Sequence, residues 1–207
     1  MKNTKERILE TALNLFNSDG LSQVTLRTIA DKMGISQGNL NYHYKKREFI
    51  IESLYFQLVS KIEEEMFKND ATDLGLATLF SMSSSIMKNF FDYRFFMLDF
   101  VQIMRENEII KAHYLELSKS REEQFSSLFD VLIRKDILLT ETLENEYFFL
   151  YKRFEILGNF WISSAEISTH KLSKKMIVEY SELINQAIFP YLTDKGRGVY
   201  FELSKNS

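Results

Sequence analysis

Apolar side chains recur every three or four positions along most of the chain, which is the spacing of one face of a helix. The first such face precedes Gly20 and comprises Ile8, Leu9, Ala12, Leu13 and Phe16. Asn3 and Glu6 stand just before it, in the spacing of a helix capping box. Strand-like alternation is scarce, and one proline and seven glycines leave few breaks. The pattern therefore predicts an all-α protein.

Two short helices are expected next. The hydroxyl of Thr25 can accept from a free backbone N–H in the first turn of the earlier one. The apolar face of this helix is Leu26, Ile29, Ala30 and Met33. Gly34 should end it, because glycine enters the left-handed conformation without a side-chain clash, and Ile35 can fold back onto the same face. Ser36 can then cap the third helix after a sharp turn.

The third helix has a polar outer face. Leu40 and Tyr44, four positions apart, point inward. The outward residues are Gln37, Asn39, Asn41, Tyr42 and His43, and Lys45, Lys46 and Arg47 follow them. Asn and Gln match the N6/N7 edge of adenine, Tyr and His reach phosphates or thymine methyls, and the basic cluster neutralises backbone charge. The face suits the major groove of DNA, and an ordinary helical hairpin with a polar surface is the alternative.

Several residues of this stretch match the N-terminal signature of a known family: Thr25, Arg27, Ile29-Ala30, Gly34-Ile35-Ser36, Gly38, Leu40, Tyr42-His43-Tyr44 and Lys45-Lys46-Arg47-Glu48. Through them the chain resembles TetR-family transcriptional regulators over about residues 5–54, roughly a quarter of its length. The resemblance implies a three-helix DNA-binding head with a helix-turn-helix, followed by a helical-bundle body for ligand binding and dimerisation. We place the head at residues 1–46 and the body at residues 47–207.

The resemblance also implies which residues meet DNA. It maps Thr25 and Arg27 onto contacts at the start of the second helix, and residues 36–44 onto the recognition helix. The family's phosphate-binding lysine falls on Arg47, with Lys46 beside it. The DNA-binding residues implied in this way are Thr25, Arg27, Ser36, Gln37, Gly38, Asn39, Asn41, Tyr42, His43, Lys46 and Arg47.

Two positions depart from the family pattern. Asn39 stands where threonine is frequent, and Asn41 stands where an aromatic residue is common, so the operator that is read can differ. One recognition helix covers too few bases, whereas two helices related by a two-fold axis can enter successive major grooves roughly 34 Å apart. The sequence thus predicts a homodimer on a near-palindromic double-stranded DNA operator.

The fourth helix is expected to begin near Arg47 and to continue toward Lys68. Its main apolar series is Ile50, Leu54, Leu58 and Ile62. This helix would join the head to the body. Residues 69–73 interrupt the pattern, and further breaks are expected near residues 91–92, 107, 136 and 170.

The last two long helical stretches are expected at about residues 141–168 and 172–192. Their apolar residues can face a second copy of the chain. The resemblance implies that these C-terminal helices form a four-helix dimer interface. The final segment, residues 193–207, has weak periodicity and two glycines, so we expect it to be ordered only by a partner surface.

Composition and charge narrow the classes of function. The chain has 207 residues, no cysteine and three histidines that lie far apart, so neither a metal nor a cofactor is expected. No apolar run approaches the roughly 20 residues that span a bilayer, and the N-terminus lacks the apolar core of a signal peptide, so we expect a cytoplasmic protein. The first 50 residues hold eight basic and five acidic side chains, and the remainder holds 18 and 24. Positive charge is therefore concentrated in the head.

Aromatic residues make up 14% of the chain and concentrate in the body. A large helical core would account for them, and a partly aromatic cavity that admits a small apolar or aromatic effector is the functional alternative. Polar residues within this apolar surround could orient such a ligand. The candidate ligand-binding residues are Phe90, Arg94, Phe96, Asp99, Phe100, His113, Phe154 and Trp161.

These features together predict a ligand-responsive repressor in which effector binding moves the fourth helix and changes the separation of the recognition helices. No organised nucleophile, base and oxyanion donors are recognisable, so no enzyme activity is expected. The alternatives are a helical protein-interaction module and a small-molecule-binding protein without a DNA-binding role. A protein-interaction module would leave the surface from Gln37 to Arg47 without a purpose.

Overall fold

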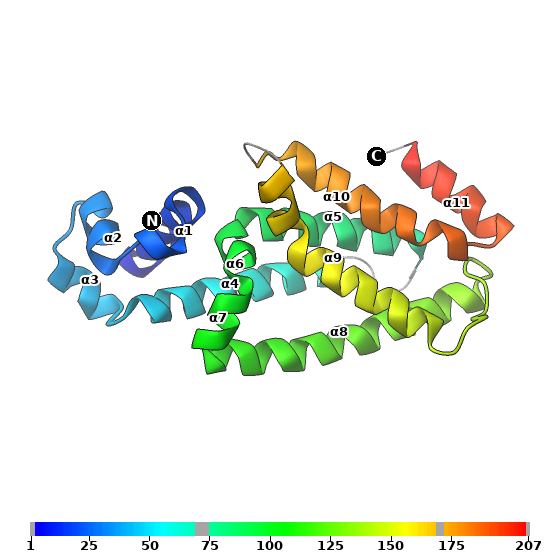
Figure 1. Ribbon diagram of the computed structural model, residues 1–207, viewed down its shortest axis with the longest axis horizontal. Helices are drawn as coiled ribbons and strands as arrows, with labels where there is room; N and C mark the ends of the chain where they lie inside the picture. Colours follow the sequence, from blue (N-terminus) through cyan, green and yellow to red (C-terminus); the bar gives the residue numbers. More distant parts are fainter. Residues whose placement is uncertain (1–2, 69–74, 169–171, 206–207) are drawn as a thin grey trace.

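The computed structural model describes residues 3–68, 75–168 and 172–205. Over these ranges the chain is α-helical and has no β-strand, which confirms the all-α prediction. Figure 1 shows the head, α1 to α3, at one end of an elongated body. The helices of the head are α1 (Thr4–Asp19), α2 (Leu26–Met33) and α3 (Gln37–His43), with a short 3-10 turn, η1 (Leu21–Gln23), between the first two.

Local hydrogen bonds begin and end the helices of the head. The side chain of Asn3 accepts from the N–H of Glu6 (2.9 Å), and the Glu6 carboxylate accepts from the N–H of Asn3 (3.1 Å). Thr25 caps α2 by accepting from the Thr28 N–H at 3.2 Å. Gly34 ends α2 in the left-handed conformation at φ 67°. The predicted caps and the stop at Gly34 are confirmed.

Local hydrogen bonds also fix the turn between α2 and α3. The N–H of Ile35 donates to the carbonyl of Ala30 at 3.1 Å, which folds Ile35 back onto the apolar face of α2. Ser36 caps α3 by accepting from the Asn39 N–H at 3.2 Å. Leu40 lies on the inner face of α3 and is fully buried, so the opposite face of this helix is directed outward.

Helix α4 (Arg47–Lys68) begins and ends at the expected residues. Ile50 and Leu54 are fully buried, and the helix runs from the head along the body (Figure 1). It packs on α1 at one end and on α5 and α8 further along. A displacement of α4 would therefore be felt by both the head and the body.

The body contains the remaining helices. They are α5 (Leu76–Asp92), α6 (Arg94–Leu98), α7 (Phe100–Glu106), α8 (Glu108–Arg134), α9 (Glu146–Ser168), α10 (Lys175–Ala187), η2 (Phe189–Tyr191) and α11 (Asp194–Ser204). The expected breaks near 91–92, 107 and 136 are confirmed: α5 ends at Asp92, Asn107 caps α8, and Asp136 adopts φ 57°. The break expected near residue 170 lies outside the described residues.

Three C-terminal predictions need correction. The helix expected from residue 141 begins at Glu146, because the Glu146 carboxylate accepts from the N–H of Thr142 (2.8 Å) and Asn145 adopts φ 59°. The stretch expected at 172–192 divides into α10 and η2, which contains Pro190. Residues 194–204 form α11 within the chain itself, so the expectation that only a partner orders this segment is wrong.

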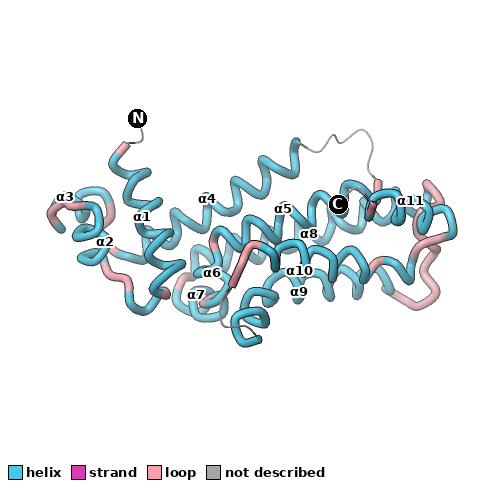
Figure 2. The backbone as a smooth tube through the Cα atoms, turned by 90° about the horizontal axis from the view of Figure 1, so that it is seen from above, coloured by secondary structure: helices cyan, strands magenta, loops and turns pink. Residues whose placement is uncertain are grey.

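Helix α11 is held on the body at the end away from the head (Figure 2). Thr193 caps it by accepting from the Gly196 N–H (3.0 Å) and donates to the Asp136 carbonyl (2.7 Å). Tyr200 is buried, with its ring 5.3 Å from that of Phe80 on α5. A Cβ at Gly196 would lie 2.1 Å from the Ile137 carbonyl oxygen, so only glycine permits this approach.

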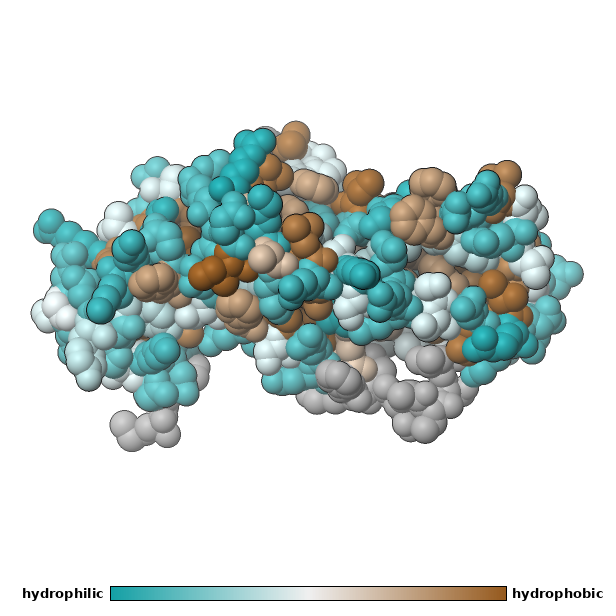
Figure 3. All heavy atoms as spheres, turned by 90° about the horizontal axis from the view of Figure 1, so that it is seen from below, coloured by the Kyte–Doolittle hydropathy of each residue, from teal (hydrophilic) through white to brown (hydrophobic). Residues whose placement is uncertain are grey.

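Large apolar side chains remain exposed on the body. Figure 3 shows apolar residues in brown among polar residues in teal over the face seen from below. On α9 and α10, the exposed apolar residues are Phe148, Phe149, Ile156, Phe160, Ile167, Val178 and Leu183. None of the described helices is long and apolar enough to cross a membrane.

Candidate nucleic-acid interface and effector cavity

The outer face of α3 carries uncharged hydrogen-bonding groups. Its exposed residues are Gln37, Gly38, Asn39, Asn41 and Tyr42. Tyr42 is 85% exposed, and the ring of the half-buried His43 lies edge-on to it at 5.3 Å. A Cβ at Gly38 would meet only the Ser36 hydroxyl, at 3.9 Å, so the open space beside Gly38 permits a close approach of another molecule.

Three of the other predicted contacts flank this face. Thr25 and Ser36 are exposed, and each hydroxyl oxygen accepts from a backbone N–H as a helix cap. Arg27 is exposed and lies 3.9 Å from the Asp31 carboxylate, a distance that contributes little stability in water. Its guanidinium is therefore available to an external anion.

The basic cluster divides into two kinds of environment. Lys45 and Lys46 are exposed. Arg47 is half-buried, and its Nη1 donates to the carbonyl oxygens of Leu21 (3.0 Å) and Val24 (3.2 Å). The Arg47 side chain thus fastens the segment before α2 to the start of α4, in addition to carrying charge.

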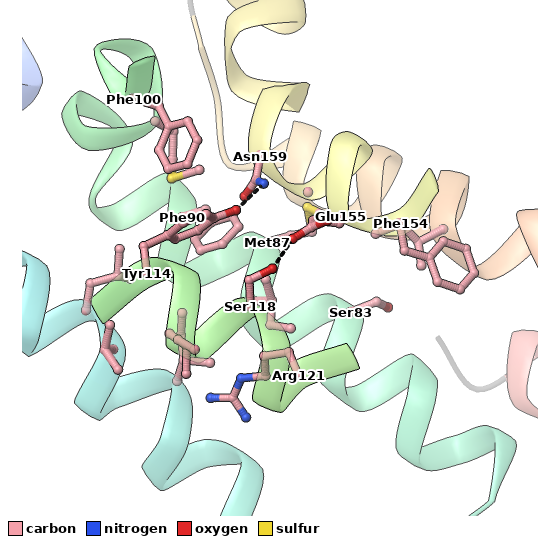
Figure 4. Close-up of a pocket in the computed structure, with 18 of the residues that line it drawn as sticks. Ser83, Met87, Phe90, Phe100, Tyr114, Ser118, Arg121, Phe154, Glu155 and Asn159 are labelled. Atoms are coloured by element: carbon pink, nitrogen blue, oxygen red, sulfur yellow. Dashed lines mark hydrogen bonds between the residues drawn. The ribbon is translucent and has the colours of Figure 1, made fainter. Parts of the chain in front are cut away.

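A cavity of about 170 Å³ lies inside the body (Figure 4). It is comparable with the ~150 Å³ engineered cavity that admits benzene. Helices α4 to α10 contribute to its wall. The lining residues are Tyr55, Leu58, Val59, Ile62, Leu79, Ser83, Ile86, Met87, Phe90, Phe96, Met97, Phe100, Tyr114, Leu117, Ser118, Arg121, Phe125, Tyr151, Phe154, Glu155, Gly158, Asn159 and Ile184. Most of these side chains are apolar or aromatic, which suits an apolar guest.

Several polar groups in the wall are paired with one another. The Asn159 amide donates to the Tyr114 hydroxyl at 2.7 Å, and the Ser118 hydroxyl donates to the Glu155 carboxylate (Figure 4). The Tyr151 hydroxyl donates to the Ser118 carbonyl at 3.2 Å, and burial raises the pKa of this hydroxyl to about 12. These pairs fix the shape of the wall.

Two family models together match most of the chain. The description "Bacterial regulatory proteins, tetR family" matches residues 8–54, and "Bacterial transcriptional repressor", of the model named TetR, matches residues 57–200. The chain belongs to the TetR family. The resemblance inferred from the head is confirmed, and the second match extends it through the body. Members of the TetR family are DNA-binding transcriptional regulators, which favours this function over a protein-interaction module.

Individual TetR-family proteins are similar over shorter stretches. The uncharacterised regulator YerO of Bacillus subtilis is 28% identical over 131 residues, which cover 60% of this chain and 45% of YerO. The class D tetracycline repressor of Escherichia coli is 30% identical over 57 residues, which cover 28% of this chain and 26% of the repressor. The aligned part of this chain thus spans less than half the length of either relative.

Solved structures support the TetR fold over the whole chain. A TetR-family regulator from Marinobacter aquaeolei superimposes with a TM-score of 0.85 at 21% identity, covering 99% of this chain and 98% of that one. The ketosteroid regulator KstR2 of Mycobacterium tuberculosis superimposes with a TM-score of 0.69 at 12% identity, covering 94% and 97%. At these identities the likeness concerns the fold.

Four predicted ligand residues of this TetR-family body line the cavity: Phe90, Phe96, Phe100 and Phe154. Arg94 does not, because its guanidinium donates to the Asn17 carbonyl of the head at 3.2 Å. Asp99 lies beside Arg47, where burial raises the pKa of its carboxyl and the Arg47 charge opposes that rise.

His113 and Trp161 also lie outside the cavity lining. The His113 ring bonds to the Tyr55 hydroxyl at 2.9 Å and packs on Phe56 of α4. Trp161 is buried between Phe91 and Tyr180, with ring centroids at 6.5 and 4.9 Å. Both are occupied by contacts between helices of the protein.

Sequence reasoning missed the polar wall of the cavity. Tyr114, Ser118, Arg121 and Phe125 stand four, three and four positions apart on α8, so they share one face of that helix. This spacing is visible in the sequence, but it does not show whether the face looks into a cavity. Among the described residues, no cluster of histidine and carboxylate side chains is suited to a metal ion.

Proposed function

We propose that this chain is a ligand-responsive repressor that binds a near-palindromic operator as a homodimer. The observation that carries the proposal is the exposed, uncharged polar face of α3 beside Lys45 and Lys46. Such a face can read base edges, while the lysines neutralise phosphates. The class D tetracycline relative is named a repressor, which supports repression as the output.

Each predicted DNA contact has a role in this proposal. Gln37, Asn39 and Asn41 meet base edges in the major groove, and Gly38 allows the backbone to come close. Thr25, Arg27, Ser36, Tyr42, His43 and Lys46 position the head on the phosphate backbone. Arg47 acts through the segment before α2, which it holds by two hydrogen bonds.

The homodimer is proposed to form through α9 and α10. A palindromic operator needs two recognition helices roughly 34 Å apart, which one chain cannot supply. On α9, Ile156 is 61% exposed, and on α10, Val178 is 70% exposed. Pairing α9 and α10 with their copies would cover this apolar surface in a four-helix bundle. In this division residues 1–46 bind DNA and residues 47–207 bind effector and partner.

The effector is proposed to be a small, largely apolar or aromatic molecule in the cavity. Tyr55, Leu58 and Ile62 of α4 line this cavity, and α4 also packs on the head. A guest that displaces α4 would therefore alter the separation of the two recognition helices. To weaken operator binding about a hundredfold, the effector must favour the non-binding state by roughly 2.7 kcal/mol, which is within the usual range of coupling between sites.

The proposal gives the chain no catalytic role and places it in the cytoplasm, where bacterial DNA is accessible. Polar side chains of the cavity wall are hydrogen-bonded to each other, as Asn159 is to Tyr114, and such a wall suits binding of a ligand. A small-molecule-binding protein without a DNA-binding role is the competing function. The two differ in whether α3 binds DNA.

Titration with duplex DNA at several salt concentrations tests the proposal. Random duplexes should bind with an affinity that falls steeply with salt, because phosphate contacts release counterions. Tyr42→Ala should weaken binding to all sequences, and Asn39→Ala should relax preference at one base pair by about 1–3 kcal/mol. Lys119→Ala, an exposed change on α8, is the control. A flat salt response, or a selected operator without two-fold symmetry, would contradict the proposal.

A further inference from the structure

Arg121 is the cationic residue in the cavity lining, and Glu155 is the anionic one. Arg121 projects from α8 with a side chain that is 17% exposed, and burial lowers its pKa because the charged form loses solvation. Its Nη1 donates to the Gln124 side chain at 2.8 Å. An arginine side chain has five N–H donors. Among the described residues, Arg121 uses one of them in this hydrogen bond.

The ion pair of Arg121 is long. Its Nη2 lies 3.9 Å from the carboxylate of Glu63, which is on α4 and is 44% exposed. At this distance, and beside solvent, the pair lacks the short bidentate hydrogen bonds that stabilise a buried guanidinium. Arg121 therefore retains donors that a carboxylate could satisfy.

Glu155 is less suited to bind a ligand cation, because its carboxylate already has partners within the protein. Its carboxylate accepts from the Ser118 hydroxyl and from the Lys152 ammonium at 3.2 Å. Lys152 also lies 3.0 Å from Glu122, so a chain of charges continues to the surface. The negative charge at the cavity wall is thus already balanced by the protein.

One apolar part of the cavity lies along α8 on the N-terminal side of Arg121. Phe100 packs on Tyr114 with ring centroids 5.2 Å apart. Tyr114 precedes Arg121 by seven residues, about 10 Å along the helix. Figure 4 shows Phe100 and Arg121 in different parts of the wall. The cavity therefore combines one cationic position with an apolar stretch that extends from it toward Phe100.

We propose that the effector is an amphipathic carboxylate whose anionic group binds Arg121 and whose apolar part extends toward Phe100. This inference rests on the proposed function, because it names the class of molecule that the regulatory cavity takes. A ligand carboxylate at Arg121 replaces Glu63 as the partner of the guanidinium. The ion pair between α8 and α4 is then lost, and α4 leads directly to the head.

Calorimetric titration with three probes of equal chain length tests the ligand class: octanoate, 1-octanol and octyltrimethylammonium. Octanoate should bind the full chain about tenfold more tightly than 1-octanol, since a hydrogen bond to a charged group contributes at least that factor. Octyltrimethylammonium should bind most weakly. Equal affinities, a preference for the cation, or no binding of octanoate would overturn the proposal.

Variants assign the preference to Arg121. Arg121→Gln should reduce octanoate binding to the level of 1-octanol and leave 1-octanol unchanged, while Arg121→Lys should keep part of the preference. Glu63→Gln removes the competing carboxylate and should tighten octanoate binding several-fold. Arg134→Gln, an exposed change on the same helix, is the control. If the Arg121→Gln chain still preferred octanoate over 1-octanol, the assignment would be contradicted. If Arg121→Gln does not fold, the octanoate affinities of Arg121→Lys and Glu63→Gln decide the test.

Operator binding measured on the same samples separates this inference from the proposed function. Octanoate should release operator from the wild-type chain and not from Arg121→Gln. Wild-type chain that binds operator but shows no preference for octanoate would overturn the carboxylate proposal alone. Wild-type chain that does not bind operator would overturn the proposed function.

Discussion

Arg47 uses one guanidinium nitrogen to hold two backbone carbonyls of the head. The oxygens of Leu21 and Val24 lie at 3.0 and 3.2 Å, directly before the cap residue Thr25. The resemblance to the family suggests a phosphate contact at this position, whereas the observed bonds fix the approach to α2. Lys46, the preceding residue, is exposed and is free to meet a phosphate.

Substitutions at these two neighbours should have different effects. Arg47→Gln should lower the free energy of unfolding by about 1–3 kcal/mol, because two buried carbonyls lose a charged donor. Lys46→Ala should leave stability unchanged and reduce the salt slope of DNA binding by about 1. Thermal denaturation and salt-dependent DNA titration measure the two effects. An Arg47→Gln chain of normal stability with a reduced salt slope would show instead that Arg47 contacts phosphate.

Sequence reasoning was accurate where the partner of a residue is local. The caps at Asn3, Thr25 and Ser36 each bond to a group three residues away, so their roles can be read from spacing. Arg94 and His113 bond to partners 77 and 58 residues away. Nothing in the local pattern distinguishes such a contact from a ligand contact, so the sequence alone does not separate these two residues from the cavity wall.

At the scale of elements, α6 has two functional sides. Phe96 and Met97 line the cavity, while Phe95 stacks on Phe16 of the head at 5.0 Å. Asn17 completes this junction: its side chain donates to the Asp92 carbonyl (2.7 Å) and accepts from the Phe95 N–H (3.0 Å). The junction is a second route, besides α4, between cavity and head.

Asn17→Ala should weaken communication between cavity and head. The substitution removes two hydrogen bonds at the junction, so the change in operator affinity caused by octanoate should shrink severalfold, with a stability loss of about 1–3 kcal/mol. Asn14→Ala, an exposed change on the same helix, is the control. Operator titrations with and without octanoate give the ratio of the two operator affinities. An unchanged ratio would mean that α4 alone carries the coupling.

Helix α11 offers a matched pair of glycines. Gly196→Ala would place a Cβ 2.1 Å from the Ile137 carbonyl oxygen and should destabilise the chain by about 1–3 kcal/mol. Gly198→Ala meets no atom within 4 Å and should be neutral or stabilising by up to about 1 kcal/mol. Chemical denaturation measures both. Equal effects would show that α11 does not dock as described.

At the scale of the whole molecule, the helices and the head were predictable, while the cavity wall was not. Helix α4 follows directly from the series Ile50, Leu54, Leu58 and Ile62, because burial repeats with the helical period. The cavity depends on how seven helices meet, and spacing within one helix does not specify that. The order of α11 does not follow from local spacing, because Thr193 bonds to the loop after α8 and Gly196 packs closely against Ile137 of that loop.

Ile156→Glu should prevent dimerisation. It places a charge at the centre of the exposed apolar face of α9, where burial against a copy would desolvate it. Sedimentation should report the 24.5 kDa monomer, and affinity for a palindromic duplex should fall to that for a half-site. Leu115→Glu, an equally exposed apolar-to-acidic change on α8, should remain a dimer. A dimeric Ile156→Glu chain would place the interface elsewhere.

Trp161 is the single tryptophan of the chain, and its position makes it an intrinsic optical reporter. It is 1% exposed, and its indole N–H has no hydrogen-bond partner among the described residues, an environment that shifts emission to short wavelength. One neighbour, Phe91, belongs to α5, which lines the cavity, and the other, Tyr180, belongs to α10. Fluorescence from this one indole can therefore follow cavity occupancy and rearrangement of α10 in the unlabelled protein.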